Sequence, residues 1–424
     1  MQYVIVGAGP AGITAAETLR KQDRSAVITV IGEEPEPPYS RMALPYYLTG
    51  QIDAAGTWLR KKAEHYHSLA IDLLQDRVVA VLPERKVVLL DGGRQIAYDK
   101  LLIATGSRPV KPPVPGIDMP GIQHCWTLRD GRNLAAALGP GAKVVLMGAG
   151  FIGCIILEAL HKSGADLSVV EMEERMVPRM MNDQAAGLIK QWCLDKGVAI
   201  HLGSRIEAFR ENTDNAASMA VQLDDGRSIA ADLVVVAAGV KANIDFLARS
   251  GIAVDQGILV NRFLQTSDEN IYAAGDVAQG LDFSTGEYTV QAIQPTAVDH
   301  GLLAARNMAG GNQAIHRGSV NMNVLDTMGL IACSFGAWMG ADGGDFVERH
   351  DPGRYRYINL QFDGEYLVGA TAIGLTEHVG VLRGLIQSRI ALGAWKPRLL
   401  EDPTRIMEAY LECTQPLDAL CRSG

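Results

Sequence analysis

The chain opens with an apolar run that ends in a glycine-rich turn, YVIVGAGPAGITAAETL at Tyr3–Leu19. Its glycines follow the spacing G-x-G-x-x-G between a predicted strand and a predicted helix. The first glycine permits a tight turn, the second lets the backbone approach a pyrophosphate, and the third lets the helix pack against the strand. Free N–H groups at the start of the helix can then bind the phosphates. We assign Gly7, Gly9, Pro10, Ala11 and Gly12 to this site.

The same pattern occurs a second time, as VVLMGAGFIGCIILEAL at Val144–Leu160. A single G-x-G-x-x-G is weak evidence, because glycine turns also arise without a nucleotide. Two copies in the same strand–helix context indicate two dinucleotide-binding units. The residues assigned to the second site are Gly148, Gly150, Phe151, Ile152 and Gly153.

Each copy is followed by a second predicted strand that ends in acid. AVITVIGEE leads to Glu33 and Glu34, and LSVVEMEE leads to Glu171. Glu33 and Glu171 lie about 20 residues beyond the last glycine, where a carboxylate accepts hydrogen bonds from an adenosine ribose. A carboxylate there repels a 2′-phosphate, so we expect the second site to prefer NAD(H) to NADP(H). Arg175, one turn farther on, weakens that preference slightly.

The two halves also close alike. YDKLLIATGSRP (98–109) and ADLVVVAAGVKAN (231–243) are buried-strand runs that end in Ala-x-Gly. They add Ala104, Thr105 and Gly106 to the first site and Gly239 to the second. The proline-rich SRPVKPPVPG (107–116) is predicted to be a linker between the units.

Composition narrows the class of protein. The chain has 424 residues, enough for two or three domains, and its 48% hydrophobic and 21% charged residues are ordinary for a globular protein. A net charge of −9 gives no support for nucleic-acid binding. The N-terminus enters a strand pattern without a signal peptide, and the uncharged apolar run at 144–157 is too short to span a bilayer. We therefore expect a cytoplasmic protein without a membrane span.

The cysteines are scattered along the chain. No two form a C-x-x-C pair and none clusters with histidine, which argues against a disulfide framework, a zinc site or an iron–sulfur cluster held by this chain alone. We expect reduced, mostly buried thiols and no metal. The six are Cys125, Cys154, Cys193, Cys333, Cys413 and Cys421.

With these motifs the chain resembles the pyridine nucleotide–disulfide oxidoreductase superfamily, the two-dinucleotide flavoproteins. The closing ATG of Ala104–Gly106 and the stretch IYAAGDVA (Ile271–Ala278) complete the resemblance, which runs from residue 1 to about 390. It implies FAD in the first unit and NAD(H) in the second. It further implies that Asp276 binds the ribityl chain of FAD and that the stretch around Ile293–Thr296 approaches the isoalloxazine. The FAD residues it adds are Val78, Gly275, Asp276, Ile293 and Thr296.

The expected fold is α/β, with two Rossmann-like dinucleotide-binding domains, for FAD and NAD, and a C-terminal α+β interface domain. The FAD domain is predicted at 1–110 and 240–316, and the NAD domain is inserted at 111–239. The interface domain with a helical tail is predicted at 317–424.

The stretch PYSRMALPYYLTG (38–50) bears on the chemistry. In the coenzyme A-disulfide reductase and NADH oxidase branch of the superfamily, a redox cysteine precedes Gly/Ala-Leu-Pro-Tyr. Here Met42 stands in that position, and a thioether forms neither a thiolate nor a disulfide. In the rubredoxin reductase and nitrite reductase branches, PY-x-R supplies an arginine near FAD, which maps onto Arg41. Pro45 is expected to shape the backbone beside the ring.

The NAD unit departs from its relatives at one position. Related enzymes often carry a glutamate near the nicotinamide, after G-F-I-G-x. Here Ile155 occupies that place, so we assign no acid there. Glu158, one turn farther on, is expected to lie on the helix face.

The resulting hypothesis is an FAD-dependent NADH:acceptor oxidoreductase. Hydride transfer between NAD(H) and FAD needs stacking geometry and no side-chain nucleophile, so no catalytic residue is assigned. Single electrons would pass between FAD and an iron–sulfur protein or subunit. One alternative is a thiol-linked NADH oxidase or coenzyme A-disulfide reductase. The other is a non-catalytic flavin-binding NADH sensor resembling apoptosis-inducing factor.

The C-terminal region suggests partners. The stretch His378–Arg398 carries Arg383, Arg389, Lys396 and Arg398 and no acid. It is interpreted either as an amphipathic helix that covers the interface domain or as a docking surface for an acidic iron–sulfur partner. The tail also resembles flavoprotein subunits of the tungsten aldehyde oxidoreductase and phenylglyoxylate dehydrogenase complexes. This implies a hetero-oligomer, with a homodimer as the alternative.

Overall fold

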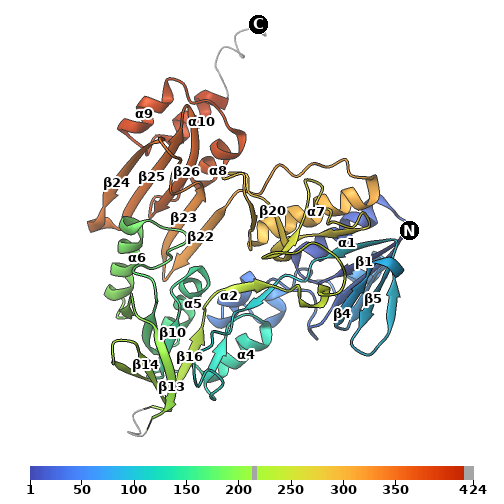
Figure 1. The fold of residues 1–424 in the computed structure, drawn as a ribbon. Helices are drawn as coiled ribbons and strands as arrows, with labels where there is room; N and C mark the ends of the chain where they lie inside the picture. The colour runs from blue at the N-terminus through green and yellow to red at the C-terminus, as the bar shows by residue number, and fades with distance from the viewer. Residues whose placement is uncertain (213–216, 415–424) are drawn as a thin grey trace. The chain divides into compact units, whose positions relative to one another are not determined.

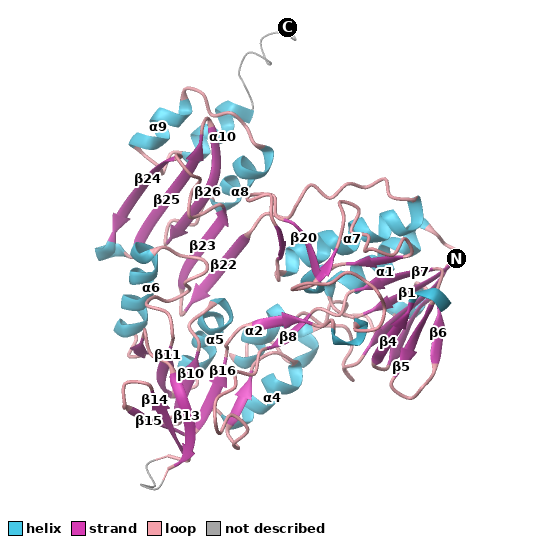
Figure 2. Ribbon diagram, viewed as in Figure 1, coloured by secondary structure: helices cyan, strands magenta, loops and turns pink. Residues whose placement is uncertain are grey.

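The computed structural model describes residues 1–212 and 217–414, which form two compact units (Figure 1). Unit 1 consists of Met1–Pro109, Trp126–Leu128 and Val240–Ser319, and unit 2 of the remaining described residues. Each unit is a mixed α/β structure (Figure 2). Among the described residues, no helix has the length and apolar character needed to cross a bilayer. Cys421 lies outside the described residues.

Unit 1 is built on a five-stranded parallel sheet in the order β19-β7-β1-β2-β3. Its central strand β1 carries the run that precedes the first glycine turn, and helix α1 follows the turn. Helix α7 packs along α1. The bounds are β1 Gln2–Val6, α1 Pro10–Gln22, β2 Val27–Gly32, β3 Ile71–Gln75, β7 Lys100–Ile103, β19 Ile271–Ala273 and α7 Gln294–Gly310.

Smaller elements complete unit 1. They are the antiparallel meander β4 Val78–Leu82, β5 Val87–Leu90 and β6 Gln95–Ala97; the pair β8 Ser107–Pro109 and β17 Val240–Ala242; the sheet β18 Ile258–Leu259, β20 Ala278–Leu281 and β21 Tyr288–Val290; the helices α2 Leu44–Leu48 and α3 His65–Ser68; and the 3₁₀ turns η1 Arg41–Ala43, η2 Ala54–Thr57, η3 Pro83–Arg85, η4 Asp245–Leu247 and η5 Gly275–Val277. Because β8 pairs with β17, the chain leaves unit 1 and returns to it along one two-stranded ribbon.

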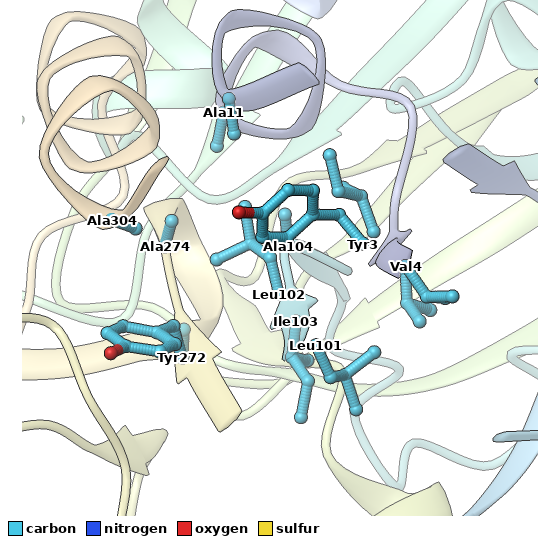
Figure 3. Packing of buried hydrophobic residues seen from close by; sticks show 14 of the residues in the cluster. Tyr3, Val4, Ala11, Leu101, Leu102, Ile103, Ala104, Tyr272, Ala274 and Ala304 are labelled. Atoms are coloured by element: carbon cyan, nitrogen blue, oxygen red, sulfur yellow. The ribbon is translucent and has the colours of Figure 1, made fainter. Parts of the chain in front are cut away.

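The core of unit 1 lies between its parallel sheet and the paired helices. The sheet contributes fully buried residues such as Leu101 and Leu102, and the helices contribute small ones, Ala11 from α1 and Ala304 from α7 (Figure 3). Small side chains on both helices allow their backbones to approach closely. This close packing brings the starts of α1 and α7, and the turn η5, into one neighbourhood.

The parallel sheet of unit 2 has the order β12-β11-β10-β16-β9, which repeats the arrangement of unit 1 around its own central strand β10. In both units a three-stranded antiparallel meander joins the outer strand to the closing strand. The bounds are β9 Ile122–His124, α4 Leu128–Ala137, β10 Lys143–Met147, α5 Phe151–Lys162, β11 Asp166–Val170, α6 Asp183–Asp195, β12 Ala199–His201, β13 Ile206–Glu211, β14 Met219–Leu223, β15 Ser228–Ala231 and β16 Leu233–Val236. The repeat predicted from the two glycine motifs therefore extends over both sheets.

The rest of unit 2 is an antiparallel five-stranded sheet with helices, drawn as the arrows β22 to β26 in Figure 2. The bounds are β22 Met322–Thr327, β23 Leu330–Gly336, β24 Asp345–Asp351, η6 Pro352–Arg354, β25 Arg356–Asp363, β26 Tyr366–Ile373, α8 Val379–Ser388, α9 Trp395–Glu401 and α10 Ile406–Thr414. Two Rossmann-like sheets and this α+β region agree with the predicted fold class.

The basic stretch near the C-terminus differs from the expected single helix. It forms α8 and α9, separated by a turn in which Arg389 has a left-handed backbone (φ +47°). Leu382, Leu385 and Ile386 of α8 are buried, as the amphipathic pattern predicts. Acids elsewhere in unit 2 pair with two cations of this stretch: Lys396 lies 2.7 Å from Asp345, and Arg398 lies 3.9 Å from Glu412.

Candidate functional site

The glycine turn between β1 and α1 is closely packed at two of its glycines and open at the third. A Cβ on Gly7 (φ +118°) would lie 2.0 Å from the carbonyl oxygen of Ala104, and one on Gly12 would lie 1.9 Å from that of Gly7. These two glycines are therefore required by the fold itself. A Cβ on Gly9 would meet nothing within 4 Å. The protein leaves space at the middle glycine, where the backbone is expected to approach a phosphate.

The second glycine turn repeats this geometry in unit 2. A Cβ on Gly148 would lie 2.6 Å from the carbonyl oxygen of Ala237, and one on Gly153 would lie 2.2 Å from that of Gly148. Gly150 again has open space around its Cβ position and is the N-cap of α5, and Phe151 and Ile152 form the first turn of that helix. Gly239, in the closing segment, has φ +97°.

The two acids that follow the second strands differ in environment. The side chain of Glu33 is 68% exposed, and its nearest cation, Arg77, is 3.9 Å away. Glu171 is buried, and its carboxylate accepts hydrogen bonds from the backbone N–H of Ala149 at 2.7 Å and of Glu173 at 3.0 Å. Glu171 therefore fixes the glycine turn as well as ending its strand.

Arg175, which could have favoured a 2′-phosphate, is already engaged. Its guanidinium donates to the carbonyl oxygens of Met181 and Pro178, and it pairs with Asp183 at 3.0 Å. These contacts hold it against its own loop. The expected preference for NAD(H) remains a prediction.

The closing strand β7 leads into a segment tied to the return of the chain. Thr105 donates from its hydroxyl to the carbonyl oxygen of Asn243, and the Asn243 side-chain amide donates back to the carbonyl oxygen of Thr105, each at 2.9 Å. Gly106 has φ +66°, and its carbonyl oxygen accepts from the N–H of Asn243. Reciprocal bonds of this kind fix the Ala104–Gly106 turn against which Gly7 packs.

Asp276 lies in the turn η5. Gly275, in the left-handed region (φ +75°), is packed between Ala11 and Ala297, where a Cβ would meet each alanine Cβ at 3.2 and 3.3 Å. The carboxylate of Asp276 accepts a hydrogen bond from the Ser107 hydroxyl at 2.8 Å. Burial raises the pKa of Asp276, and the bond from Ser107 and the charge of Arg41 oppose the rise.

The N-terminus of α7 lies in the same neighbourhood. Ile293 is its N-cap, Thr296 is buried in its first turn, and Gly301 packs so closely that a Cβ would lie 2.3 Å from the carbonyl oxygen of Ala11. Ser40 donates a hydrogen bond to the side chain of Gln294 at 2.5 Å. The stretch at 38–50 is therefore attached to the start of α7.

Arg41 is held by a polar network. It pairs with Glu34 at 2.9 Å, donates to the carbonyl oxygen of Ser107 at 3.2 Å, and lies over the ring of Trp126 at 5.0 Å. Tyr39 donates to the other carboxylate oxygen of Glu34 at 2.6 Å and accepts from the N–H of Leu128 at 3.1 Å. Glu34 makes these protein contacts, and its predicted contact with FAD remains a prediction.

The remaining predicted positions are distributed less tightly. Met42, in η1, is 46% exposed, and Pro45 lies in the first turn of α2. Val78 packs against the hydrophobic core of unit 1. Ile155 is half-buried on α5, and Glu158 pairs with Lys162 on the same helix.

Sequence reasoning did not identify several residues of this site. Ser107, Tyr39 and Trp126 join the network around Arg41 and Asp276 (see above). Ser107 directly follows the ATG motif, which is a usable signal. Trp126 comes from three residues that rejoin unit 1 between two segments of unit 2, and no local pattern marks such a return.

Comparisons with known proteins identify the family. The profile of the pyridine nucleotide-disulphide oxidoreductases matches residues 1–301. The chain belongs to this family. The NADH-dependent phenylglyoxylate dehydrogenase subunit epsilon of Aromatoleum evansii is 33% identical to this chain over 408 residues, 96% of each protein. An NADH oxidase of Methanocaldococcus jannaschii is 33% identical over 321 residues, covering 73% of this chain and 70% of that protein.

A solved structure gives the same result in three dimensions. The ferredoxin reductase for the CYP199A2 system from Rhodopseudomonas palustris matches with a TM-score of 0.82 at 28% identity, covering 89% of this chain and 92% of that one. As a pyridine nucleotide-disulphide oxidoreductase, the protein is an FAD- and NAD(H)-dependent oxidoreductase. A Cβ at Gly9 in unit 1 or at Gly150 in unit 2 would meet nothing within 4 Å, and the binding of a dinucleotide at each turn remains a prediction.

Proposed function

We propose that the protein is the flavoprotein component of a redox system that connects NADH to a one-electron iron–sulfur protein or subunit. The observation that carries the proposal is that unit 1 contains no cysteine. The five cysteines that the structure describes all fall in segments of the other unit, and Met42 stands where a redox thiol would be expected. Electrons on the flavin would therefore leave without a thiol relay.

The cysteines of unit 2 are poor substitutes. Cys125, Cys154, Cys193 and Cys333 are buried. Burial raises the pKa of Cys193 and of Cys333 to about 12, so neither forms a thiolate near neutral pH. Cys413 is partly exposed on α10, and burial raises its pKa as well. These thiols support a route that bypasses disulfide chemistry.

We propose which residues of unit 1 hold each part of FAD. The open middle glycine, Gly9, and the start of α1 would hold the pyrophosphate, and Glu33 would accept the adenosine ribose hydroxyls. Asp276 would accept from the ribityl chain, and Arg41 would supply positive charge. The start of α7 would direct its dipole toward the ring. FAD bound there supplies hydride acceptance from NADH and release of single electrons.

In unit 2 the chain supplies coenzyme binding. Gly150 and the N-terminus of α5 would hold the pyrophosphate of NADH, while Glu171 keeps the glycine turn in place through Ala149. Ile155 provides an apolar surface where relatives carry glutamate. We therefore propose that nicotinamide placement relies on packing and backbone groups rather than on an acid.

Partner and location are further parts of the proposal. The relative from Aromatoleum evansii is named as a subunit and matches this chain over 96% of both lengths, which supports a hetero-oligomer. A reductase named for its ferredoxin shares the fold. We place the protein in the cytoplasm. Purification from the native source should yield an iron–sulfur protein in stoichiometric amount. If none is present, the protein acts as a reductase of one chain and the hetero-oligomer proposal is wrong.

An anaerobic experiment tests the electron route. NADH should bleach the flavin without a long-wavelength thiolate-to-flavin absorbance band. The reduced protein is then mixed with a [2Fe–2S] ferredoxin, a rubredoxin or coenzyme A disulfide. An iron–sulfur acceptor should reoxidise the flavin at least about 100-fold faster than the disulfide does, a barrier difference of about 2.7 kcal/mol. Faster reoxidation by the disulfide would overturn the proposal.

A second candidate function is suggested by the relative named NADH oxidase. Under this alternative, molecular oxygen would be the main acceptor. Oxygen consumption per NADH, measured with and without ferredoxin, separates the two. Oxidase turnover equal to ferredoxin-coupled turnover would favour the oxidase.

A further inference from the structure

Two buried histidines lie behind the turn that carries Asp276. His300 projects from the second turn of α7, and its Nδ1 is 3.4 Å from the backbone nitrogen of Gly275. Its Nε2 is 3.0 Å from the Ser319 hydroxyl, and that hydroxyl is 3.1 Å from Nε2 of His316. The two imidazole rings meet edge to face, with centroids 4.8 Å apart. All four residues belong to unit 1.

The hydrogen-bond direction in this group is set by the backbone. The N–H of Gly275 can only donate, so Nδ1 of His300 must carry a lone pair. The neutral ring then carries its proton on Nε2 and donates to Ser319. The Ser319 hydroxyl is in turn free to donate to Nε2 of His316. One direction of donation, from Gly275 through His300 and Ser319 to His316, accounts for these three contacts with both imidazole rings neutral.

The group is attached to rigid parts of the unit. Ser319 donates from its N–H to the carbonyl oxygen of Leu281, and its own carbonyl oxygen accepts from the N–H of Phe283 and from the side chain of Gln291 at 3.0 Å. Gln291 lies shortly before the N-cap of α7. The imidazole of His300 is therefore fixed at its far end by strand β20 and by the segment that leads into α7.

We propose that His300 is a positioning residue for the cofactor: its neutral imidazole holds the backbone N–H of Gly275 and thereby sets the Asp276 carboxylate for FAD. Gly275 has a left-handed backbone (φ +75°) and is packed between Ala11 and Ala297, so a bond to its N–H fixes the orientation of the turn. The Asp276 side chain next to it accepts a hydrogen bond from the Ser107 hydroxyl. This inference rests on the proposed assignment of Asp276 to FAD.

A matched pair of variants tests the contact. In His300→Asn the amide oxygen replaces Nδ1 and can still accept from Gly275, whereas in His300→Gln the amide lies near Nε2 and keeps only the bond to Ser319. FAD affinity of the folded apoprotein is measured through the fluorescence of free FAD. We expect His300→Asn to remain within about threefold of the wild type and His300→Gln to bind FAD at least about tenfold more weakly. Equal affinities in the two variants would contradict the proposal.

Two measurements distinguish positioning from general stabilisation. Both variants lose one of the two bonds of His300, so their apoproteins should unfold at similar denaturant concentrations while their FAD affinities and flavin midpoint potentials differ. In wild-type holoprotein, ¹⁵N NMR of labelled histidine should show His300 protonated on Nε2. A proton on Nδ1 would overturn the proposal without any variant.

The assignment of Asp276 has its own control. Asp276→Ala should weaken FAD binding whether or not His300 acts as proposed. If Asp276→Ala binds FAD like the wild type, the FAD assignment of this turn is wrong. If Asp276→Ala weakens binding and His300→Gln does not, the assignment stands and the positioning role of His300 is wrong.

Discussion

Arg41 and Met42 are adjacent in the sequence but differ in how the protein holds them. Arg41 is fixed by Glu34, Ser107 and Trp126, whereas its neighbour Met42 is 46% exposed and is not among the buried core residues. Two adjacent positions of one 3₁₀ turn therefore differ in what they can do. The first supplies an anchored charge, and the second supplies only a thioether.

Met42→Ala should leave the rate of hydride transfer from NADH to FAD within about tenfold of the wild type, a barrier change below about 1.4 kcal/mol. The reason is that a thioether takes no part in hydride transfer. Stopped-flow reduction of the flavin measures this rate. Met42→Cys is the matched variant, because a thiolate at this position should add a long-wavelength absorbance band. A loss of several orders of magnitude in Met42→Ala, with FAD still bound, would show that the side chain is essential.

At the scale of elements, the contact between α1 and α7 is the most sensitive part of the site. Gly301→Ala should destabilise unit 1 by about 1–3 kcal/mol, since its Cβ would lie 2.3 Å from the carbonyl oxygen of Ala11. The same substitution should lower FAD affinity, because Ala11 belongs to the glycine turn. Urea unfolding and FAD titration measure the two effects.

Gly310→Ala is the control on the same helix. Its Cβ would meet nothing within 4 Å, so the change should be neutral or stabilising by up to about 1 kcal/mol. If both substitutions destabilise the protein equally, the loss would come from helix α7 in general and not from its contact with α1.

The buried histidine on α7 predicts an acid-sensitive unit. Burial, with a smaller contribution from His316, lowers the pKa of His300 to about 3. The unfolded chain, with a histidine pKa near 6.5, therefore binds a proton first, and stability falls as the pH drops from about 6.5 towards 3. For this single group the loss is about 2 kcal/mol at pH 5.

The difference in unfolding free energy between wild type and His300→Asn, measured in urea at pH 7.5 and pH 5, isolates this contribution. It should shrink by about 2 kcal/mol at the lower pH. Burial also lowers the pKa of His316, with Asp299 opposing, and that residue is present in both proteins. A difference that does not depend on pH would show that His300 titrates normally.

On the scale of the whole molecule, the sequence could predict the repeat but not its full extent. Glycines at fixed spacing mark the turns, because only glycine tolerates the contacts made by Gly7 and Gly12. The two antiparallel meanders at 78–97 and 206–231 contain no residue type at a fixed spacing, so the sequence has no comparable marker for them. Trp126–Leu128 belongs to unit 1 because of its tertiary contacts. A local sequence pattern does not predict such contacts.

Site residues followed the same rule. The two glycine turns, with Gly9 and Gly150 at their open positions, were predictable from spacing. The side-chain networks were not predictable: the position of Glu34 in the sequence does not show that Tyr39 and Arg41, five and seven residues later, engage its carboxylate. The domain boundaries and the list of cofactor-binding residues remain predictions.

Because the two open glycines lie in different units, the two coenzymes should be separable by mutation. Gly150→Ala should keep a normal FAD content and normal reduction by dithionite, yet lose flavin reduction by NADH by at least about tenfold, because the added methyl occupies the pyrophosphate space. Gly9→Ala should be isolated largely without FAD and still bind NADH. Absorbance spectra and NADH titrations test both. FAD loss in Gly150→Ala would contradict this separation.

The burial of Glu171 has a consequence for changing coenzyme preference. Its carboxylate holds the N–H groups of Ala149 and Glu173, so replacing it would release the glycine turn that any dinucleotide needs. Redesign for NADPH should therefore leave Glu171 unchanged. The exposed Met172 and Glu173 beside it are the positions at which an arginine could be introduced. We therefore expect coenzyme preference to be changeable at Met172 and Glu173 but not at Glu171.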